Sequence, residues 1–235
     1  TMSALLEVRE LEFSYGEVQV LRGLDLAVEA GGIVCVMGRN GVGKTTFLRN
    51  VVGLEAPTCG SISLGGRDFT RRSAHERAVA GIGYVPQGRQ IFPRLTVEEN
   101  LKVGLEAAGK GQPAVPDEVY TLFPILWEMR RRRGGDLSGG QQQQLAISRA
   151  LATNPNILVL DEPTEGIQPN VITEIGKVIR KLVAERNIAV LLVEQYVDFV
   201  REFADSFHIM NRGSFVAEGA TDELDDSLVR RLLSV

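Results

Sequence analysis

IVCVMGRNGVGKTT, residues 33–46, is the stretch that decides the fold of this 235-residue chain. It opens on an uninterrupted apolar run, which is typical of a strand buried on both faces of a parallel sheet. Gly38, Gly43, Lys44 and Thr45 then match the spacing of a glycine-rich phosphate-binding loop. A helical pattern of apolar residues follows at once. Strand, loop and helix in this order predict a phosphate-binding loop within an α/β sheet.

The residues of this loop predict how a nucleoside triphosphate is held. Glycines let the backbone curl so that its amide groups point at the phosphates, and the helix that begins at Lys44 adds its positive end. We expect Lys44 to reach the β- and γ-phosphates and the Thr45 hydroxyl to hold Mg²⁺. The expected nucleotide-binding residues of the loop are Gly38, Asn40, Gly41, Val42, Gly43, Lys44, Thr45 and Thr46. ATP and Mg²⁺ are therefore the expected cofactors.

A pair of acidic residues, Asp161 and Glu162, follows a second buried apolar run at residues 157–160. A parallel strand delivers such residues to the edge of the sheet where open α/β folds bind ligands. Because successive strand residues point to opposite sides, we expect the two carboxylates to divide their roles. Asp161 is predicted to hold Mg²⁺ through water, and Glu162 to act as the general base toward water. Alone, an acidic turn after a strand is common, but together with the phosphate loop it indicates a site that hydrolyses a nucleoside triphosphate.

Composition sets the class of protein around this site. Hydrophobic residues make up 44% of the chain and the formal net charge is −4, which excludes a protein whose main role is to coat nucleic acid. The two cysteines form no disulfide framework, so a reducing compartment is expected. No signal-peptide pattern and no apolar stretch long enough to span a bilayer is apparent. Any crossing of a membrane is therefore expected of other chains.

The third motif is Leu-Ser-Gly-Gly-Gln at residues 137–141, where a helix is expected to begin. A serine and two glycines at a helix start offer a hydroxyl and free amides to an anion. With this motif, essentially the whole chain resembles the ATP-binding-cassette family. The resemblance implies that two cassettes pair head to tail. The residues implied to close over the partner's ATP are Ser138, Gly139, Gly140 and Gln141. An ordinary helix start with a serine cap is the alternative.

The same resemblance implies the architecture and further site residues. It implies one domain over residues 1–235: a nucleotide-binding core at about 1–87 and 153–235, and a helical subdomain at about 88–152. The fold class is α/β, a mostly parallel sheet with an N-terminal antiparallel β-subdomain. Tyr15 matches the aromatic residue that stacks on adenine, and Gln87 matches a glutamine that contacts Mg²⁺ and links to the membrane subunit. Gln195 stands where most of the family has a catalytic histidine, and a glutamine cannot carry its charge.

Within the family the chain resembles the ATPase subunits of urea importers most. Residues 85–96, 163–169 and 193–196 carry this resemblance, and branched-chain amino-acid importers are the close alternative. Implied partners are a second ATPase subunit in a heterodimer, two transmembrane permease subunits and a periplasmic or extracellular substrate-binding protein. The implied location is the cytoplasmic face of the plasma membrane, with membrane contact through the permease only. DNA-repair cassettes need a long coiled coil and translation cassettes normally have two cassettes, and neither pattern is present.

Two weaker features lie between residues 97 and 152, where the pattern is helical except for a glycine- and proline-containing surface loop at about 109–116. Arg130 to Arg133 form a basic run, which we interpret as a solvated helical face, with contact to phosphate or an acidic partner as the alternative. Trp127 is expected to lie in the core of the helical subdomain.

Overall fold

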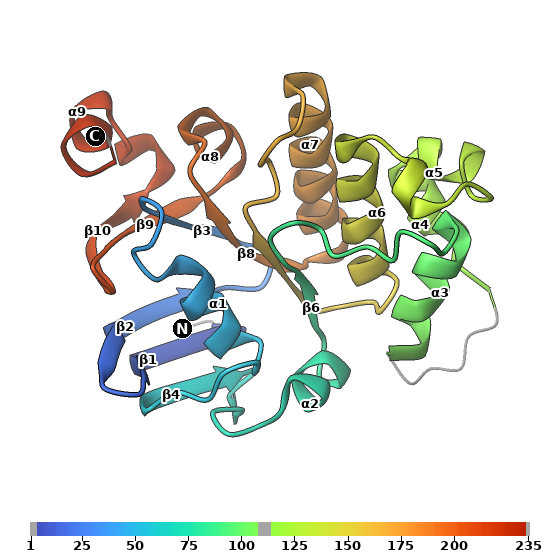
Figure 1. The fold of residues 1–235 in the computed structure, drawn as a ribbon. Helices are drawn as coiled ribbons and strands as arrows, with labels where there is room; N and C mark the ends of the chain where they lie inside the picture. The colour runs from blue at the N-terminus through green and yellow to red at the C-terminus, as the bar shows by residue number, and fades with distance from the viewer. Residues whose placement is uncertain (1–3, 108–113, 234–235) are drawn as a thin grey trace.

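The computed structural model describes residues 4–107 and 114–233, so the predicted loop at 109–116 lies largely outside the described residues. Two sheets and a cluster of helices make up this part of the chain (Figure 1). The strands are β1 (Leu6–Tyr15), β2 (Val18–Val28), β3 (Ile33–Met37), β4 (Cys59–Leu64), β5 (Arg67–Asp68), β6 (Ile82–Val85), β7 (Ile157–Asp161), β8 (Ala189–Glu194), β9 (Ser206–Asn211) and β10 (Ser214–Ala220). The α-helices are α1 (Lys44–Val51), α2 (Ala74–Val79), α3 (Val97–Ala107), α4 (Asp117–Leu122), α5 (Pro124–Glu128), α6 (Gly139–Leu151), α7 (Pro169–Arg186), α8 (Val197–Phe203) and α9 (Asp226–Leu232).

The central sheet has the strand order β10-β9-β3-β8-β7-β6. Its strands from β9 to β6 pair in parallel, and only the hairpin of β9 and β10 is antiparallel. The phosphate-binding segment leaves β3 and the acidic pair leaves β7, with β8 between them. Because all three strands are parallel, their carboxyl ends meet at one edge of the sheet.

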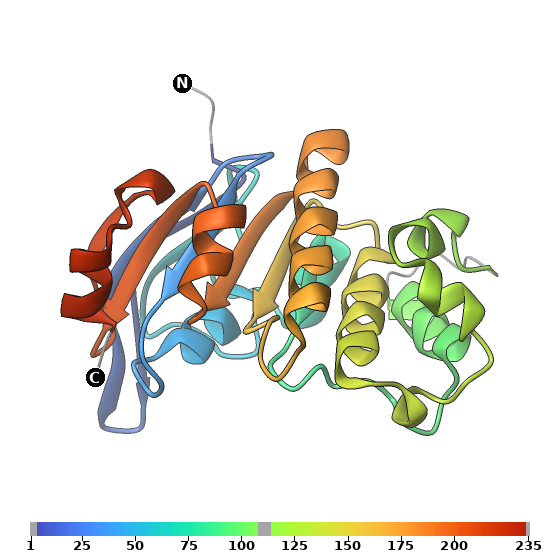
Figure 2. The same cartoon turned by 90° about the horizontal axis from the view of Figure 1, so that it is seen from above.

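The smaller sheet, in the order β2-β1-β4-β5, is antiparallel and comes mostly from the N-terminal sixty residues. Helix α1 lies between it and the central sheet, whereas α7 and α8 cover the opposite face (Figures 1 and 2). The predicted fold class, a mostly parallel nucleotide-binding core with an antiparallel β-subdomain and an inserted group of helices, is confirmed.

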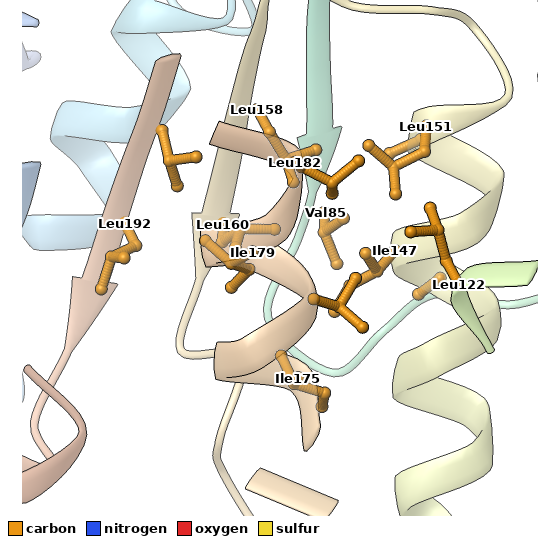
Figure 3. Packing of buried hydrophobic residues seen from close by; sticks show 14 of the residues in the cluster. Val85, Leu122, Ile147, Leu151, Leu158, Leu160, Ile175, Ile179, Leu182 and Leu192 are labelled. Atoms are coloured by element: carbon orange, nitrogen blue, oxygen red, sulfur yellow. The ribbon is translucent and has the colours of Figure 1, made fainter. Parts of the chain in front are cut away.

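Alternate side chains of each buried strand in the central sheet pack into two different hydrophobic clusters. On β7, Ile157 and Val159 face the cluster that includes α1 and the smaller sheet. Leu158 and Leu160 face the second cluster, where Figure 3 shows them packed beside Ile179 and Leu182 of α7. Because both faces are covered, the strand reads as a continuous apolar run in the sequence.

Helices α3 to α6 lie together beyond the β6 edge of the sheet (Figures 1 and 2). Ile147 and Leu151 of α6 and Leu122 of α4 turn toward the core of α7 and the sheet (Figure 3). These helices lie within residues 97–151, inside the proposed helical subdomain, whose boundaries stay a prediction.

Two expectations for this region are wrong. Trp127 is 50% exposed, and it stacks edge-on against Tyr120 with Arg130 over its ring at 4.1 Å. Helix α5 ends at Glu128, so the basic run after it forms a turn rather than a helical face, and Arg133 pairs with Thr96 in an isolated bridge.

Candidate functional site

The loop between β3 and α1 curls tightly because of its glycines. A Cβ atom at Gly38 would lie 2.6 Å from the carbonyl oxygen of Met210, so no side chain fits there. Gly43 has φ of 113° at the N-terminus of α1, which is a conformation that L-residues rarely adopt. The loop backbone therefore turns sharply into the first turn of the helix, where free amide groups favour an anion.

Lys44 places a positive charge inside this loop. Its side chain is 4% exposed, and Nζ donates to the carbonyl oxygens of Gly38 at 2.8 Å and Arg39 at 2.9 Å. Nζ also lies 3.4 Å from Oε1 of Glu162. A buried lysine beside free helix amides provides the charge and the donors that a polyphosphate requires.

Asp161 is the last residue of β7 and is 1% exposed. Its Oδ1 lies 3.4 Å from the Thr45 hydroxyl, while its Oδ2 is buried without a hydrogen-bond partner. Burial raises the pKa of this carboxyl from 3.8 to about 6, and the Thr45 hydrogen bond opposes the shift. A buried carboxylate with an unpartnered oxygen beside a hydroxyl fits a divalent cation.

The donor set fits a hard divalent cation such as Mg²⁺, because Thr45, Asp161 and Gln87 all offer oxygen atoms. Among the described residues, no group of three or more His, Cys, Asp or Glu side chains could hold a metal by itself. A cation here would therefore share its coordination with phosphate oxygens and water, as Mg²⁺ commonly does in nucleotide sites.

Glu162 takes up its position by a route that strand alternation did not predict. β7 ends at Asp161, and Glu162 has φ of 48°, in the left-handed region. The two carboxylates therefore diverge because the backbone turns, rather than because they alternate along a strand. Oε1 of Glu162 accepts from Nε2 of Gln195 at 2.6 Å, and Oε2 accepts from Nε2 of Gln87 at 3.3 Å.

Gln195 connects the acidic side of the site with the phosphate loop. Besides Glu162, its Nε2 donates to Oδ1 of Asn40 at 2.8 Å. The side chain that replaces the expected histidine thus spans the distance between the predicted base and the loop. It can donate hydrogen bonds there without carrying charge.

Lys44, Thr45, Gln87 and Glu162 lie around one cleft with a volume of about 260 Å³. Tyr15, at the end of β1, lies at the cleft with 46% of its surface exposed, and its ring packs edge-on against Phe13. The cleft is lined by Tyr15, Val20, Asn40, Gly41, Gly43, Lys44, Thr45, Thr46, Gln87 and Glu162. An exposed aromatic ring beside a phosphate loop is suited to stacking on a nucleotide base.

The residues of the third motif lie elsewhere. Ser138 caps α6: its hydroxyl accepts from the Gln141 amide at 3.3 Å, and the Gln141 side chain accepts from the Ser138 amide at 3.0 Å. Neither residue, nor Gly139 or Gly140, lines the cleft around Lys44. Outside the third motif, every predicted site residue except Gly38, Val42, Asp161 and Gln195 lines this cleft, and the third motif lies apart from it.

Two residues near the site were missed in the sequence. Arg89 has φ of 68°, donates to the Glu165 carbonyl at 3.1 Å and has its guanidinium beside Gly139. Glu194 is a carboxylate only 2% exposed at the end of β8. The sequence does carry a signal for Glu194, because an acidic residue there ends an apolar strand run. It carries no such signal for Arg89.

Comparison with known proteins places this geometry in a family. A family model described as "ABC transporter" matches residues 21–165. The chain is 38% identical over 213 residues to the high-affinity branched-chain amino acid transport ATP-binding protein BraG of Pseudomonas aeruginosa, covering 90% of this chain and 91% of that protein. It is 36% identical to the lipopolysaccharide export system ATP-binding protein LptB of Haemophilus influenzae, covering 97% of this chain and 96% of that protein.

Two solved structures of ATP-binding cassettes have the same fold as this chain. The crystal structure of a nucleotide-free ATP-binding cassette from an ABC transporter superposes with a TM-score of 0.85 at 26% identity, covering 99% of this chain and 96% of the other. A dimeric structure of a post-hydrolysis state of another cassette, bound to ADP and phosphate, superposes with a TM-score of 0.82 at 26% identity, covering 92% and 98%.

Proposed function

This chain belongs to the ABC transporter family and is an ATPase whose hydrolysis is coupled to transport, and from that premise we propose that it drives the import of urea or short amides. The observation that carries the motor assignment is the cleft in which buried Lys44 and Glu162 lie 3.4 Å apart beside Gln195. A phosphate-binding cation, a carboxylate and a hydrogen-bond donor there meet the needs of phosphoryl transfer to water.

We assign the chemical roles as follows. Lys44 and the amides of the loop bind the β- and γ-phosphates, and Tyr15 stacks on adenine. Thr45, Asp161 and Gln87 would hold Mg²⁺, which would neutralise phosphate charge when bound with ATP. Glu162 accepts a proton from the attacking water, and Gln195 donates to the γ-phosphate. The amide donors of Gln87 and Gln195 fix the orientation of the Glu162 carboxylate in the site.

We propose that a second ATPase chain completes the site. Ser138, Gly139 and Gly140 start α6 away from the cleft, so they do not serve the nucleotide of their own chain. Free amides at the start of this helix are suited to the γ-phosphate held by a partner. Because Gln195 lacks the charge of a histidine, we further propose that the working pair is a heterodimer in which this chain is the weaker site.

The permease is proposed to dock in an apolar groove of about 550 Å³. Leu54, Phe92 and Val103 line it, with 51%, 44% and 37% of their surfaces exposed. The groove includes residues 90–92, which follow Gln87 closely in the chain. Gln87 in turn donates a hydrogen bond to Glu162. A cytoplasmic segment of the permease with apolar side chains fits this surface, and the adjoining loop connects it to the ATP cleft.

This arrangement gives the proposed location. Among the residues that the structure describes, no helix is both long and apolar enough to cross a membrane. We propose that the chain works at the cytoplasmic face of the plasma membrane and contacts the membrane through the permease, with a substrate-binding protein on the other side.

The proposed cargo rests on loop sequences alone. Gln87 and the segment at 163–169 favour urea or short amides, whereas the name of one relative, BraG, refers to branched-chain amino acids. Branched-chain amino acids are therefore the second candidate cargo. No atom of the ATP site meets the cargo, so a transport measurement must decide.

The test uses proteoliposomes that contain this chain, its partner ATPase and the permease, with the binding protein added. Urea, acetamide and leucine are compared for stimulation of ATP hydrolysis and for ATP-dependent uptake of the labelled compound. We expect urea or acetamide to stimulate both, and a complex with Glu162→Gln to show neither. Stimulation by leucine alone would replace the proposal with branched-chain amino-acid import.

A further inference from the structure

We propose that Glu194 is a positioning residue for ATP hydrolysis: its buried carboxylate ties the turn that follows Glu162 to the turn that carries Gln195. This inference rests on the roles assigned above to Glu162 and Gln195. Glu194 itself is not assigned a contact with nucleotide or metal.

The geometry of this carboxylate is that of a bridge. Oε1 accepts from the backbone amide of Thr164 at 2.9 Å, and Thr164 lies two residues after Glu162. Oε2 accepts from the backbone amides of Gln195 at 3.0 Å and Tyr196 at 3.3 Å. Each oxygen therefore serves a different turn, and three backbone donors converge on one side chain.

The Glu194 carboxylate is buried, which costs free energy unless its oxygens are hydrogen-bonded. Glu194 is 2% exposed, and none of the ion pairs found among the described residues includes it. Burial raises the pKa of its carboxyl above the ordinary value, and the amide hydrogen bonds oppose that shift. Burial of a carboxylate at the end of an apolar strand costs free energy, and the hydrogen bonds from the backbone amides and the Thr164 side chain offset that cost. We therefore assign this carboxylate the role of positioning the two turns rather than of stabilising the fold.

The bridge acts on the distance between two site residues. Gln195 Nε2 meets Glu162 Oε1 at 2.6 Å, and the Glu162 amide donates to the Val193 carbonyl at 3.0 Å. Those contacts hold only while the two turns stay in register with each other. Thr164 is also buried, so the loop after Glu162 has its anchor at Glu194 inside the protein. Loss of that anchor lets Glu162 and Gln195 move relative to Lys44.

The test compares Glu194→Gln and Glu194→Ala with the wild type in the full chain and in its assembled transporter. Glutamine keeps the size and one acceptor oxygen, but it turns an NH₂ group toward one set of backbone donors. We expect kcat for ATP to fall about 3- to 10-fold in Glu194→Gln and about 100-fold in Glu194→Ala, as for displaced catalytic groups. KM for ATP should stay within about twofold, because Glu194 hydrogen-bonds to neither Lys44 nor the backbone amides of the phosphate loop, which bind the phosphates.

A second readout separates positioning from general loss of structure. Hydrogen exchange should speed up at the amides of Thr164, Gln195 and Tyr196 together, while the amides of β7 and β8 keep their protection. The control is Leu192→Val, which alters a fully buried apolar side chain two residues earlier in the same strand. It should lower thermal stability without changing kcat per folded molecule.

Two results would overturn the proposal. Unchanged kcat and unchanged exchange in Glu194→Gln would overturn it, as would a fall in kcat that tracks thermal stability equally in Leu192→Val. Failure of the proposed function has a different appearance, since the Glu162→Gln variant would then hydrolyse ATP at the wild-type rate. In that case the exchange data would still report whether Glu194 links the two turns.

Discussion

At the scale of single residues, the two adjacent carboxylates of the site have different surroundings. Glu162 accepts hydrogen bonds from Gln87 and Gln195 and lies beside Lys44, whereas Asp161 is buried with one oxygen unpartnered. The first is held in a fixed orientation by two amide donors. The second has a free oxygen that suits a cation. The two residues should therefore fail in different ways when each loses its charge.

Glu162→Gln keeps the shape of the side chain and removes its basicity. We expect ATP binding to persist while hydrolysis falls by about two to four orders of magnitude, which is the usual worth of a positioned general base. Nucleotide binding measured by fluorescence titration, beside single-turnover hydrolysis, checks both parts. Lys44→Ala is the contrasting variant, because it should weaken ATP binding itself. Turnover at the wild-type rate in Glu162→Gln would place the base elsewhere.

Asp161→Asn is expected to stabilise the metal-free chain while it abolishes magnesium-dependent hydrolysis. The pKa of Asp161 rises from 3.8 to about 6 through burial, so the folded state binds the proton more tightly than the unfolded state. The stability that protonation provides is present below pH 3.8 and is lost as pH rises through 6.

At neutral pH the neutral asparagine should therefore raise the free energy of unfolding by about 1–3 kcal/mol. Urea denaturation with chelator measures it, and exposed Asp222→Asn is the matched control, with an expected change near zero. A destabilised Asp161→Asn would show that the carboxylate is not strained without metal.

At the scale of elements, the helix that carries Lys44 is short and is held at its far end. Arg77 of α2 is 1% exposed and donates to the carbonyl oxygens of Asn50 and Val51, at the end of α1, at 2.8 and 2.7 Å. It also donates to the carbonyls of Thr70 and Arg72. A buried cation at a helix C-terminus is favourable because it meets the negative end of the helix dipole.

Arg77→Met should therefore destabilise the chain by about 3 kcal/mol, because it leaves several buried carbonyls without donors. Denaturant unfolding measures this loss. Arg72→Met, just before α2, is the control, since Arg72 is exposed and pairs with Glu76 at the surface, and it should cost under about 0.5 kcal/mol. Equal costs for the two variants would show that the cap of α1 does not matter.

Also at this scale, the sequence predicted elements whose pattern is local. The apolar runs at β3, β7 and β8 gave buried parallel strands, and the glycine spacing after β3 gave the turn into α1. The turn at Glu162 was not predictable from alternation, because a positive φ there depends on how β7 ends. Trp127 was misplaced because the spacing of an apolar residue on a five-residue helix does not tell which face meets the core.

The site could be predicted wherever a motif lies in one segment. Contacts between segments could not: Gln195 with Asn40, Arg89 with Glu165 and Glu194 with Thr164 each join residues far apart in the chain. The roles of the individual site residues stay predictions until they are tested by substitution.

At the scale of the whole molecule, the uncharged Gln195 predicts unequal sites in an assembly with a second ATPase chain. A charged contact is worth about 1.5–3 kcal/mol and a neutral one about 0.5–1.5 kcal/mol. Gln195→His should therefore speed hydrolysis at this chain's site by about tenfold if the group acts mainly in the transition state. Hydrolysis per assembled transporter measures the effect, and a fully active homodimer of this chain alone would contradict the asymmetry.

The central claim is that each ATP site is divided between two chains, with Lys44 from one and Ser138 from the other. The most direct measurement is vanadate trapping of a photoactivatable, labelled ATP in the assembled transporter, followed by separation of the two ATPase chains. We predict that Lys44→Ala removes the label from this chain. Ser138→Arg should instead remove it from the partner chain and leave this chain labelled. If Ser138→Arg strips the label from this chain and spares the partner, the chain completes its own site, and the account of a shared motor is contradicted.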